Sequence, residues 1–111
     1  MKIAISSSGN NLDAAVDSRF GRCANFVLVN TDNMQFDVIE NNNQGLSNGA
    51  GIQTARLMAE AGVCAVLTGS CGPNAHRTLT AAGIAVYSGI RGSVADAVTQ
   101  YREGRLTAAD S

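Results

Sequence analysis

The second half of the chain alternates helical and strand patterns, and this alternation limits the fold more than any other feature. Apolar residues recur at helical spacing over 52–61, and a continuous apolar run, VCAVLT, follows at 63–68. A second helical pattern starts at Pro73, the apolar run IAVYS occupies 84–88, and a last helix follows Ser93. Strands that alternate with helices form parallel sheets covered by helices, so an α/β fold is predicted.

The first half predicts an antiparallel addition to that sheet. KIAIS at 2–6 has the apolar content of a buried strand. The runs FVLVNT at 26–31 and FDVIEN at 36–41 are joined by a turn through Asp32 and Asn33, which is typical of a hairpin. The expected element order is therefore β-ββ-α-β-α-β-α, in a mixed sheet that is parallel on one side.

Turn and capping residues set the expected helix boundaries. Pro73 suits the first position of a helix, which Gly83 then ends, and Gly62 ends the preceding helix. SVAD at 93–96 resembles a capping box, in which the Ser and the Asp satisfy backbone N–H groups reciprocally. The Asn- and Gly-rich stretch at 41–51 is expected to be a loop.

Length and composition exclude several classes of protein. The 111 residues predict one domain over 1–106, with a last helix that ends near Glu103 and a frayed tail at 107–111. No apolar run approaches the ~20 residues that a membrane span needs, and the N-terminal run is too short for a signal peptide. A cytoplasmic location without a membrane partner is therefore expected. A net charge of −1 argues against a nucleic-acid partner.

The carboxyl ends of the parallel strands are the expected place for a ligand. The loops at 6–11, 69–74 and 88–93 should gather there, and the last two lead into helix N-termini, which attract anions. Arg91 lies in one of these loops, and glycines would let a ligand approach the backbone closely: Gly69, Gly72, Gly89 and Gly92. These features predict a concave pocket that accepts an anion.

Three side chains are candidate soft-metal ligands. Cys71 lies at a turn before a helix N-terminus, which stabilises thiolates, and His76 follows about one turn into that helix. Cys23 follows Arg22, a cation that would lower the pKa of the thiol; the alternative is a small buried residue. Cys71 and His76 are half of a tetrahedral set, which Cys23 or cluster sulfides could complete. The alternative for His76 is a helix-surface residue, and Cys64 is interpreted as inert core.

Three motifs resemble the dinitrogenase iron–molybdenum cofactor biosynthesis family, which comprises small nitrogenase accessory carriers and relatives outside nitrogen fixation. The motifs are VDSRFGRC at 16–23, GAGIQTARLMAEAGV at 49–63 and GSCGPNAHRTLTAAGIAVYSG at 69–89, and the resemblance spans residues 1 to about 106. It implies a three-layer α/β/α fold of the ribonuclease H-like type with a mixed five-stranded sheet. It also implies a domain that binds or carries metal–sulfur clusters, or their precursors, without catalysing turnover.

The resemblance also implies which residues would bind the cluster. In the nitrogenase branch a His typically precedes the FG motif, whereas here that position is Arg19. This departure favours another anionic cluster over the nitrogenase cofactor itself, and the candidates are a Mo-Cu sulfide, as in the orange protein group, and a FeMo-cofactor precursor. The predicted cofactor-binding residues are Arg19, Phe20, Gly21, Arg22, Gly69, Gly72, Pro73, Asn74 and Arg91, and the candidate metal ligands are Cys71, Cys23 and His76.

The predicted function is therefore a non-catalytic carrier that exchanges an anionic metal–sulfur cluster with a donor or acceptor protein. A phosphate-ligand binding or regulatory module could use the same helix N-termini. An enzyme would need a base beside Cys71, for which His76 is the only imidazole, and a ligand-free interaction domain is a further alternative. Nuclease chemistry is not expected, because Asp13 and Asp17 lie in a loop and the strands supply no central acidic cluster.

Overall fold

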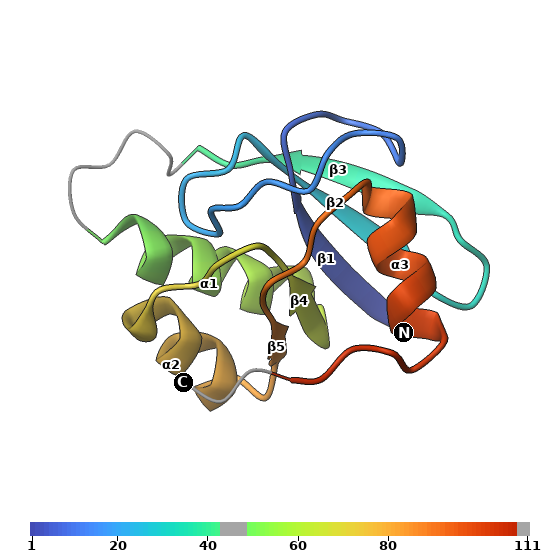
Figure 1. Cartoon of the computed structure of the whole chain (residues 1–111). Helices are drawn as coiled ribbons and strands as arrows, with labels where there is room; N and C mark the ends of the chain where they lie inside the picture. The colour runs from blue at the N-terminus through green and yellow to red at the C-terminus, as the bar shows by residue number, and fades with distance from the viewer. Residues whose placement is uncertain (43–48, 109–111) are drawn as a thin grey trace.

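The strands form one mixed sheet in the order β3-β2-β1-β4-β5 (Figure 1). The computed structural model describes residues 1–42 and 49–108. Over this part of the chain the elements are β1 (Lys2–Ser7), β2 (Asn25–Asn30), β3 (Phe36–Glu40), α1 (Ala50–Ala61), β4 (Ala65–Leu67), α2 (Pro73–Ala81), β5 (Ala85–Tyr87) and α3 (Val94–Arg102). Strands β1, β4 and β5 are parallel, and β2 is antiparallel to both β1 and β3. The predicted hairpin and the predicted parallel half are both confirmed.

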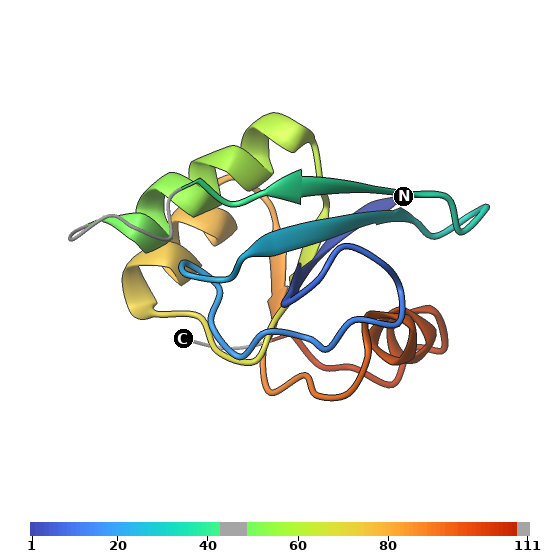
Figure 2. The same cartoon turned by 90° about the horizontal axis from the view of Figure 1, so that it is seen from above.

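Alternating side chains of the central strand face two different cores, because successive residues of a strand point to opposite faces. Ala4 packs in a cluster with Met58 of α1 and Leu79 of α2. Ile3 and Ile5 pack on the other face, in a cluster that includes three residues of α3: Val94, Ala97 and Val98. Figure 2 shows the result, with α1 and α2 on one side of the sheet and α3 on the other. The predicted three-layer α/β/α fold of the ribonuclease H-like type is confirmed.

Most element boundaries lie within a residue of the predicted ones, and β4 and α1 differ by more. Strand β4 pairs over only three residues, although the apolar run extends over 63–68, because apolar character reports burial and not ladder pairing. Helix α1 begins at Ala50, two residues before the predicted start, directly after the left-handed Gly49 (φ 72°). The capping box of α3 is confirmed, since the N–H of Asp96 donates to Ser93 Oγ at 3.1 Å and the N–H of Ser93 donates back at 3.4 Å.

Two predictions fall partly or wholly outside the described residues. These are the centre of the loop predicted at 41–51 and the end of the tail predicted at 107–111. Among the described residues, no helix combines the length and the apolar character needed to cross a membrane.

Candidate functional site

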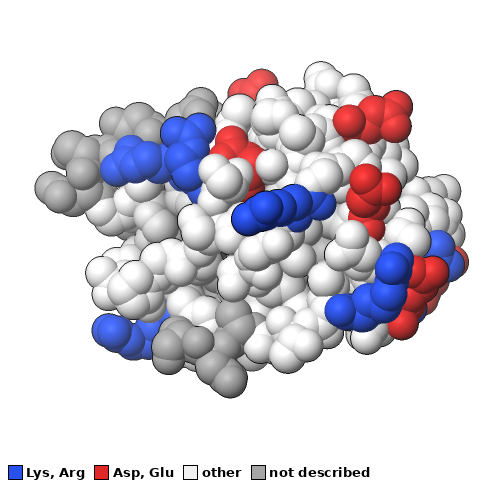
Figure 3. Space-filling view, viewed as in Figure 1, with Lys and Arg blue, Asp and Glu red and all other residues white. Residues whose placement is uncertain are grey.

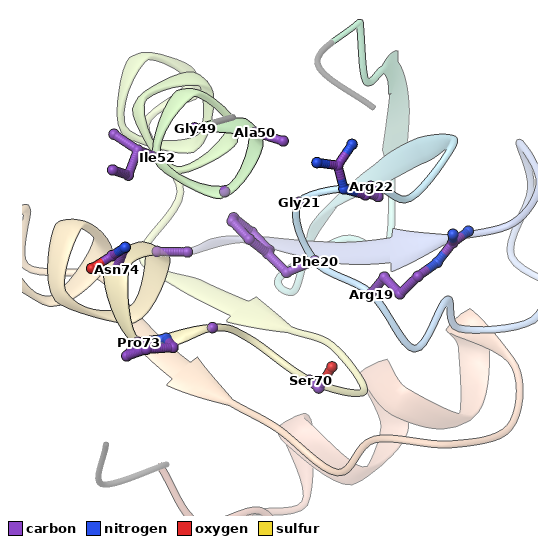
Figure 4. Close-up of a pocket in the computed structure, with 13 residues that line it drawn as sticks. Arg19, Phe20, Gly21, Arg22, Gly49, Ala50, Ile52, Ser70, Pro73 and Asn74 are labelled. Atoms are coloured by element: carbon purple, nitrogen blue, oxygen red, sulfur yellow. The ribbon is translucent and has the colours of Figure 1, made fainter. Parts of the chain in front are cut away.

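A pocket of about 440 Å³ lies where two helix N-termini meet one loop (Figure 4). The loop contributes residues 19–22, the start of α1 contributes 49–52, and the start of α2 with its preceding turn contributes Ser70 and 72–75. Seven of the nine residues predicted to bind a cofactor line this pocket, and the two exceptions are Gly69 and Arg91. The seven are Arg19, Phe20, Gly21, Arg22, Gly72, Pro73 and Asn74.

Both helix N-termini at the pocket leave their first backbone N–H groups without a side-chain cap. Gly49 and Gly72 occupy the N-cap positions and have no side chain that could accept a hydrogen bond. Neither first turn contains an acidic residue. The N–H groups of a first turn, together with the helix dipole, attract negative charge. Two such ends face one cavity, so the backbone alone makes it suitable for an anion.

The loop approaches α1 so closely that only glycine fits at one position. A Cβ on Gly21 would lie 3.0 Å from the backbone N and Cα of Gly51. Real Cβ atoms rarely come this close to backbone atoms, so a larger residue would push the loop away from the helix. Gly21 therefore sets the width of the pocket between the loop and α1.

Phe20 forms the apolar floor of the pocket. Its side chain is 2% exposed, and its ring meets Phe26 of β2 edge-on with the centroids 5.4 Å apart. In Figure 4 the ring points into the space between the starts of α1 and α2. This packing ties the loop to the sheet.

Two arginines supply positive charge at the rim. Both side chains are exposed, and Figure 4 shows Arg22 beside the start of α1, with Arg19 extending away from the centre of the pocket. Arg19 is held there by Asp17, whose Oδ1 accepts from the backbone N–H at 2.9 Å and from Nε at 3.4 Å. On the face drawn in Figure 3, basic side chains border the hollowed end, while most acidic atoms lie away from it.

Gly69 and Arg91 border a second, smaller cavity of about 210 Å³. A backbone bridge between Arg19 and Ser70 lies where the two cavities adjoin, and Ser70 lines both. The predicted meeting of the loops at 69–74 and 88–93 is confirmed at this second cavity, where the N–H of Gly89 donates to the carbonyl of Gly69 at 2.8 Å. The loop at 6–11, which was expected to join them, lines neither cavity. The free N–H groups predicted beyond 88–93 are already bonded. The capping box uses those of Ser93 and Asp96, and those of Val94 and Ala95 donate to the carbonyls of Ala14 and Leu12, each at 2.9 Å.

The structure does not support the predicted acidity of the two candidate thiols. Burial, with a smaller contribution from the charge of Asp17, raises the pKa of Cys23 to about 12. Burial also raises the pKa of Cys71 to about 11. Neither environment therefore supplies the lowered thiol pKa that the sequence predicted. Arg22 does not lower the pKa of Cys23 because its side chain is exposed, whereas the thiol faces the interior.

The three candidate metal ligands do not meet at one point. Neither Cys23, Cys71 nor His76 lines the main pocket. Within residues 1–42 and 49–108, no three His, Cys, Asp or Glu side chains are close enough to hold a metal ion. The prediction that Cys23 completes a set with the other two is therefore wrong. The surface alternative for His76 is also wrong, because this residue is only 7% exposed.

The N-terminus of α1 is the part of the pocket that sequence analysis missed. The helical apolar stripe begins at Ile52, and the pocket is lined by the three residues before it, 49–51. The signal was the pair of glycines in GAGIQTAR, which flank Ala50 at the helix start. Their contact with residues 19–22 is made across about 30 residues of sequence and has no local pattern.

Known proteins match this chain over nearly its whole length. The family model described as dinitrogenase iron-molybdenum cofactor matches residues 1–104. The apo form of the orange protein from Desulfovibrio gigas superimposes with a TM-score of 0.97 and 39% identity, over 99% of this chain and 93% of that chain. A Thermotoga protein solved by NMR gives a TM-score of 0.83 and 33% identity, over 96% and 91% of the two chains. An uncharacterized protein from Methanocaldococcus jannaschii is 32% identical over 109 residues, which are 96% of this chain and 89% of that protein.

The chain is a small three-layer α/β protein with the same fold as the orange protein. More particularly, it belongs to the dinitrogenase iron-molybdenum cofactor family, as the three sequence motifs predicted.

Proposed function

We propose that this protein binds an anionic metal–sulfur cluster, or its precursor, in the pocket between the loop at 19–22 and the starts of α1 and α2. The observation that carries the proposal is the pair of helix N-termini, without side-chain caps, that opens on one cavity beside two arginines. Membership of a family described by the iron-molybdenum cofactor supports a cluster as the ligand. The cluster we propose contains molybdenum, either as a Mo-Cu sulfide or as a FeMo-cofactor precursor, and the likeness to the orange protein supports a cluster-related role.

The residues present fit a cluster that is held by charge and hydrogen bonds. Backbone N–H groups and guanidinium groups donate to anionic sulfides or oxides without forming metal bonds. They do not fit a cluster tied by several thiolates, because neither Cys23 nor Cys71 lines the pocket. Loose electrostatic binding suits a carrier, which must release its cargo to an acceptor protein. We therefore propose a cytoplasmic, non-catalytic carrier.

Uptake of a defined thiometallate tests this function. The protein would be purified anaerobically, analysed for Mo, Cu, Fe and sulfide, and then titrated with tetrathiomolybdate, with and without copper, by visible absorption. We expect stoichiometric uptake that Arg22→Ala weakens and Arg102→Ala, on the distant α3, leaves unchanged. Cys71→Ala should also leave uptake unchanged, because that thiol does not line the pocket. Wild-type protein that takes up no metal under any of these conditions would refute the proposal.

A phosphate ligand is the second candidate, and the same observation favours it. Helix N-termini and arginines bind phosphate as readily as thiometallates. The two candidates separate in one titration series with inorganic phosphate and with tetrathiomolybdate, each in the absence of copper. Saturable phosphate binding that Arg22→Ala weakens, together with no thiometallate uptake, would establish the phosphate module instead.

A further inference from the structure

A buried polar pair lies directly behind the pocket loop and outside the pocket lining. Asn41 follows β3 and is 1% exposed, and Thr54 lies in α1 and is 0% exposed. Buried polar side chains require hydrogen-bond partners, and their partners show what they hold in place. Here the partners belong to the loop that carries Arg22.

The side-chain amide of Asn41 spans two carbonyl groups of that loop. Its Nδ2 donates to the carbonyl of Gly21 at 3.0 Å and to the carbonyl of Cys23 at 2.9 Å. Its Oδ1 accepts from the hydroxyl of Thr54 at 3.3 Å. Only this orientation of the amide satisfies both contacts, because carbonyl oxygens can only accept.

The two bonded carbonyls flank Arg22. The carbonyl of Gly21 points inward to Asn41, and it also lies 3.4 Å from the Thr54 hydroxyl, whose single proton it shares with Asn41 Oδ1. In a trans peptide the C=O and the following N–H point in opposite directions, so the N–H of Arg22 points outward. The backbone on both sides of Arg22 is thus fixed from the interior.

We propose that Asn41 is a positioning residue for the ligand pocket, and that with Thr54 it holds residues 21–23 in the conformation that presents Arg22 to an anionic ligand. This inference rests on the proposed function of the pocket. Asn41 touches no ligand itself, because it lies under the loop. Without its amide, the carbonyl of Cys23 would lose this donor and the carbonyl of Gly21 would keep only the longer contact to the Thr54 hydroxyl, so the loop would have to move to find water.

Three variants separate this role from a general effect on stability. Asn41→Ala removes the amide, and Thr54→Val removes a hydroxyl at nearly constant shape. Thr54→Ser restores that hydroxyl and serves as the conservative rescue. Val98→Ala is the control, because Val98 is fully buried in the core on the opposite face of the sheet.

Two measurements are made on each full-length variant. Amide hydrogen exchange by NMR, without ligand, reports whether residues 21–24 open more often. Titration with tetrathiomolybdate reports affinity. For Asn41→Ala we expect exchange of these amides to rise and affinity to fall, each by about tenfold or more relative to Val98→Ala. Thr54→Val should raise the amide exchange and lower the affinity by smaller factors than Asn41→Ala. Thr54→Ser should behave as wild type in both measurements.

Equal effects of Asn41→Ala and Val98→Ala on affinity would overturn the proposal. It would also be overturned if loop exchange changed no more in Asn41→Ala than in the control. If wild-type protein takes up no tetrathiomolybdate, the proposed function fails, and the exchange comparison alone then decides whether Asn41 fixes the loop.

Discussion

Replacing Gly21 by Ala should weaken the fold and the pocket together. The new Cβ would lie 3.0 Å from two backbone atoms of Gly51, and backbone cannot move aside as a flexible side chain can. Gly21 does not have a left-handed φ, so the cost is one of packing alone. Overpacking of this kind costs about 1–3 kcal/mol. For a chain of this length, the melting temperature should fall by roughly 4 °C for each kcal/mol.

Urea denaturation and calorimetry measure this loss, and Gly72→Ala is the matched control. Gly72 lines the same pocket, but a Cβ there meets no atom within 4 Å, and its φ of −66° suits any residue. Its replacement should cost less than about 1 kcal/mol, the scale of an N-cap substitution. The displaced loop of Gly21→Ala should also bind tetrathiomolybdate more weakly. Equal stability of the two variants would refute the close approach of loop and helix on which this reasoning depends.

Three further predictions follow from the same geometry. Asp17→Asn should tighten tetrathiomolybdate binding severalfold in a titration, because it removes a negative charge and releases the Arg19 side chain. The Asn side-chain oxygen still accepts from the backbone N–H of Arg19, so the loop should keep its shape. Unchanged or weaker binding would contradict this prediction. Ser93→Ala should lower the free energy of unfolding by about 1 kcal/mol in urea without changing that binding, since it removes a cap remote from the pocket. The free energy of unfolding should fall as pH rises from about 9 to 11. In the unfolded chain the thiols of Cys23 and Cys71 have an ordinary pKa of 9.0 and release their protons over this range. In the folded protein their raised pKa values keep the protons bound. Cys23→Ala should reduce this slope in denaturation at several pH values, and an identical slope would refute the burial argument.

The fold was predictable because its determinants are local. The periodicity over 52–61 and the apolar runs around it need only a few neighbouring residues to be recognised. The capping box at Ser93 is likewise complete within four residues. The start of α1 was predicted two residues late, because Ala50 and Gly51 belong to the helix without contributing to its apolar stripe. Periodicity detects the buried face of a helix and not its first turn.

The site was only partly predictable because it depends on contacts between distant segments. The turn at 69–74 carries its own signals, a glycine pair and Pro73, and most of it lines the pocket. The contact of Gly21 with Gly51 has no such signal. Cys23 shows the same limit, since it adjoins Arg22 in sequence but faces the interior, where burial and not the neighbouring cation sets its pKa.

The distribution of helix caps divides this small domain into a stabilising part and a binding part. Helix α3 satisfies its first N–H groups with Ser93 and Asp96, and it packs on the face of the sheet away from the main pocket. Helices α1 and α2 have Gly49 and Gly72 at their N-cap positions. Their first N–H groups therefore have no side-chain cap, and both helix starts line one cavity. Glycine at an N-cap costs only a few tenths of a kcal/mol relative to Ser or Asp, so these two helix starts stay without side-chain caps at little cost to the fold. An anion that bonds to both helix starts would add stability to the folded state, which couples ligand binding to the order of the pocket.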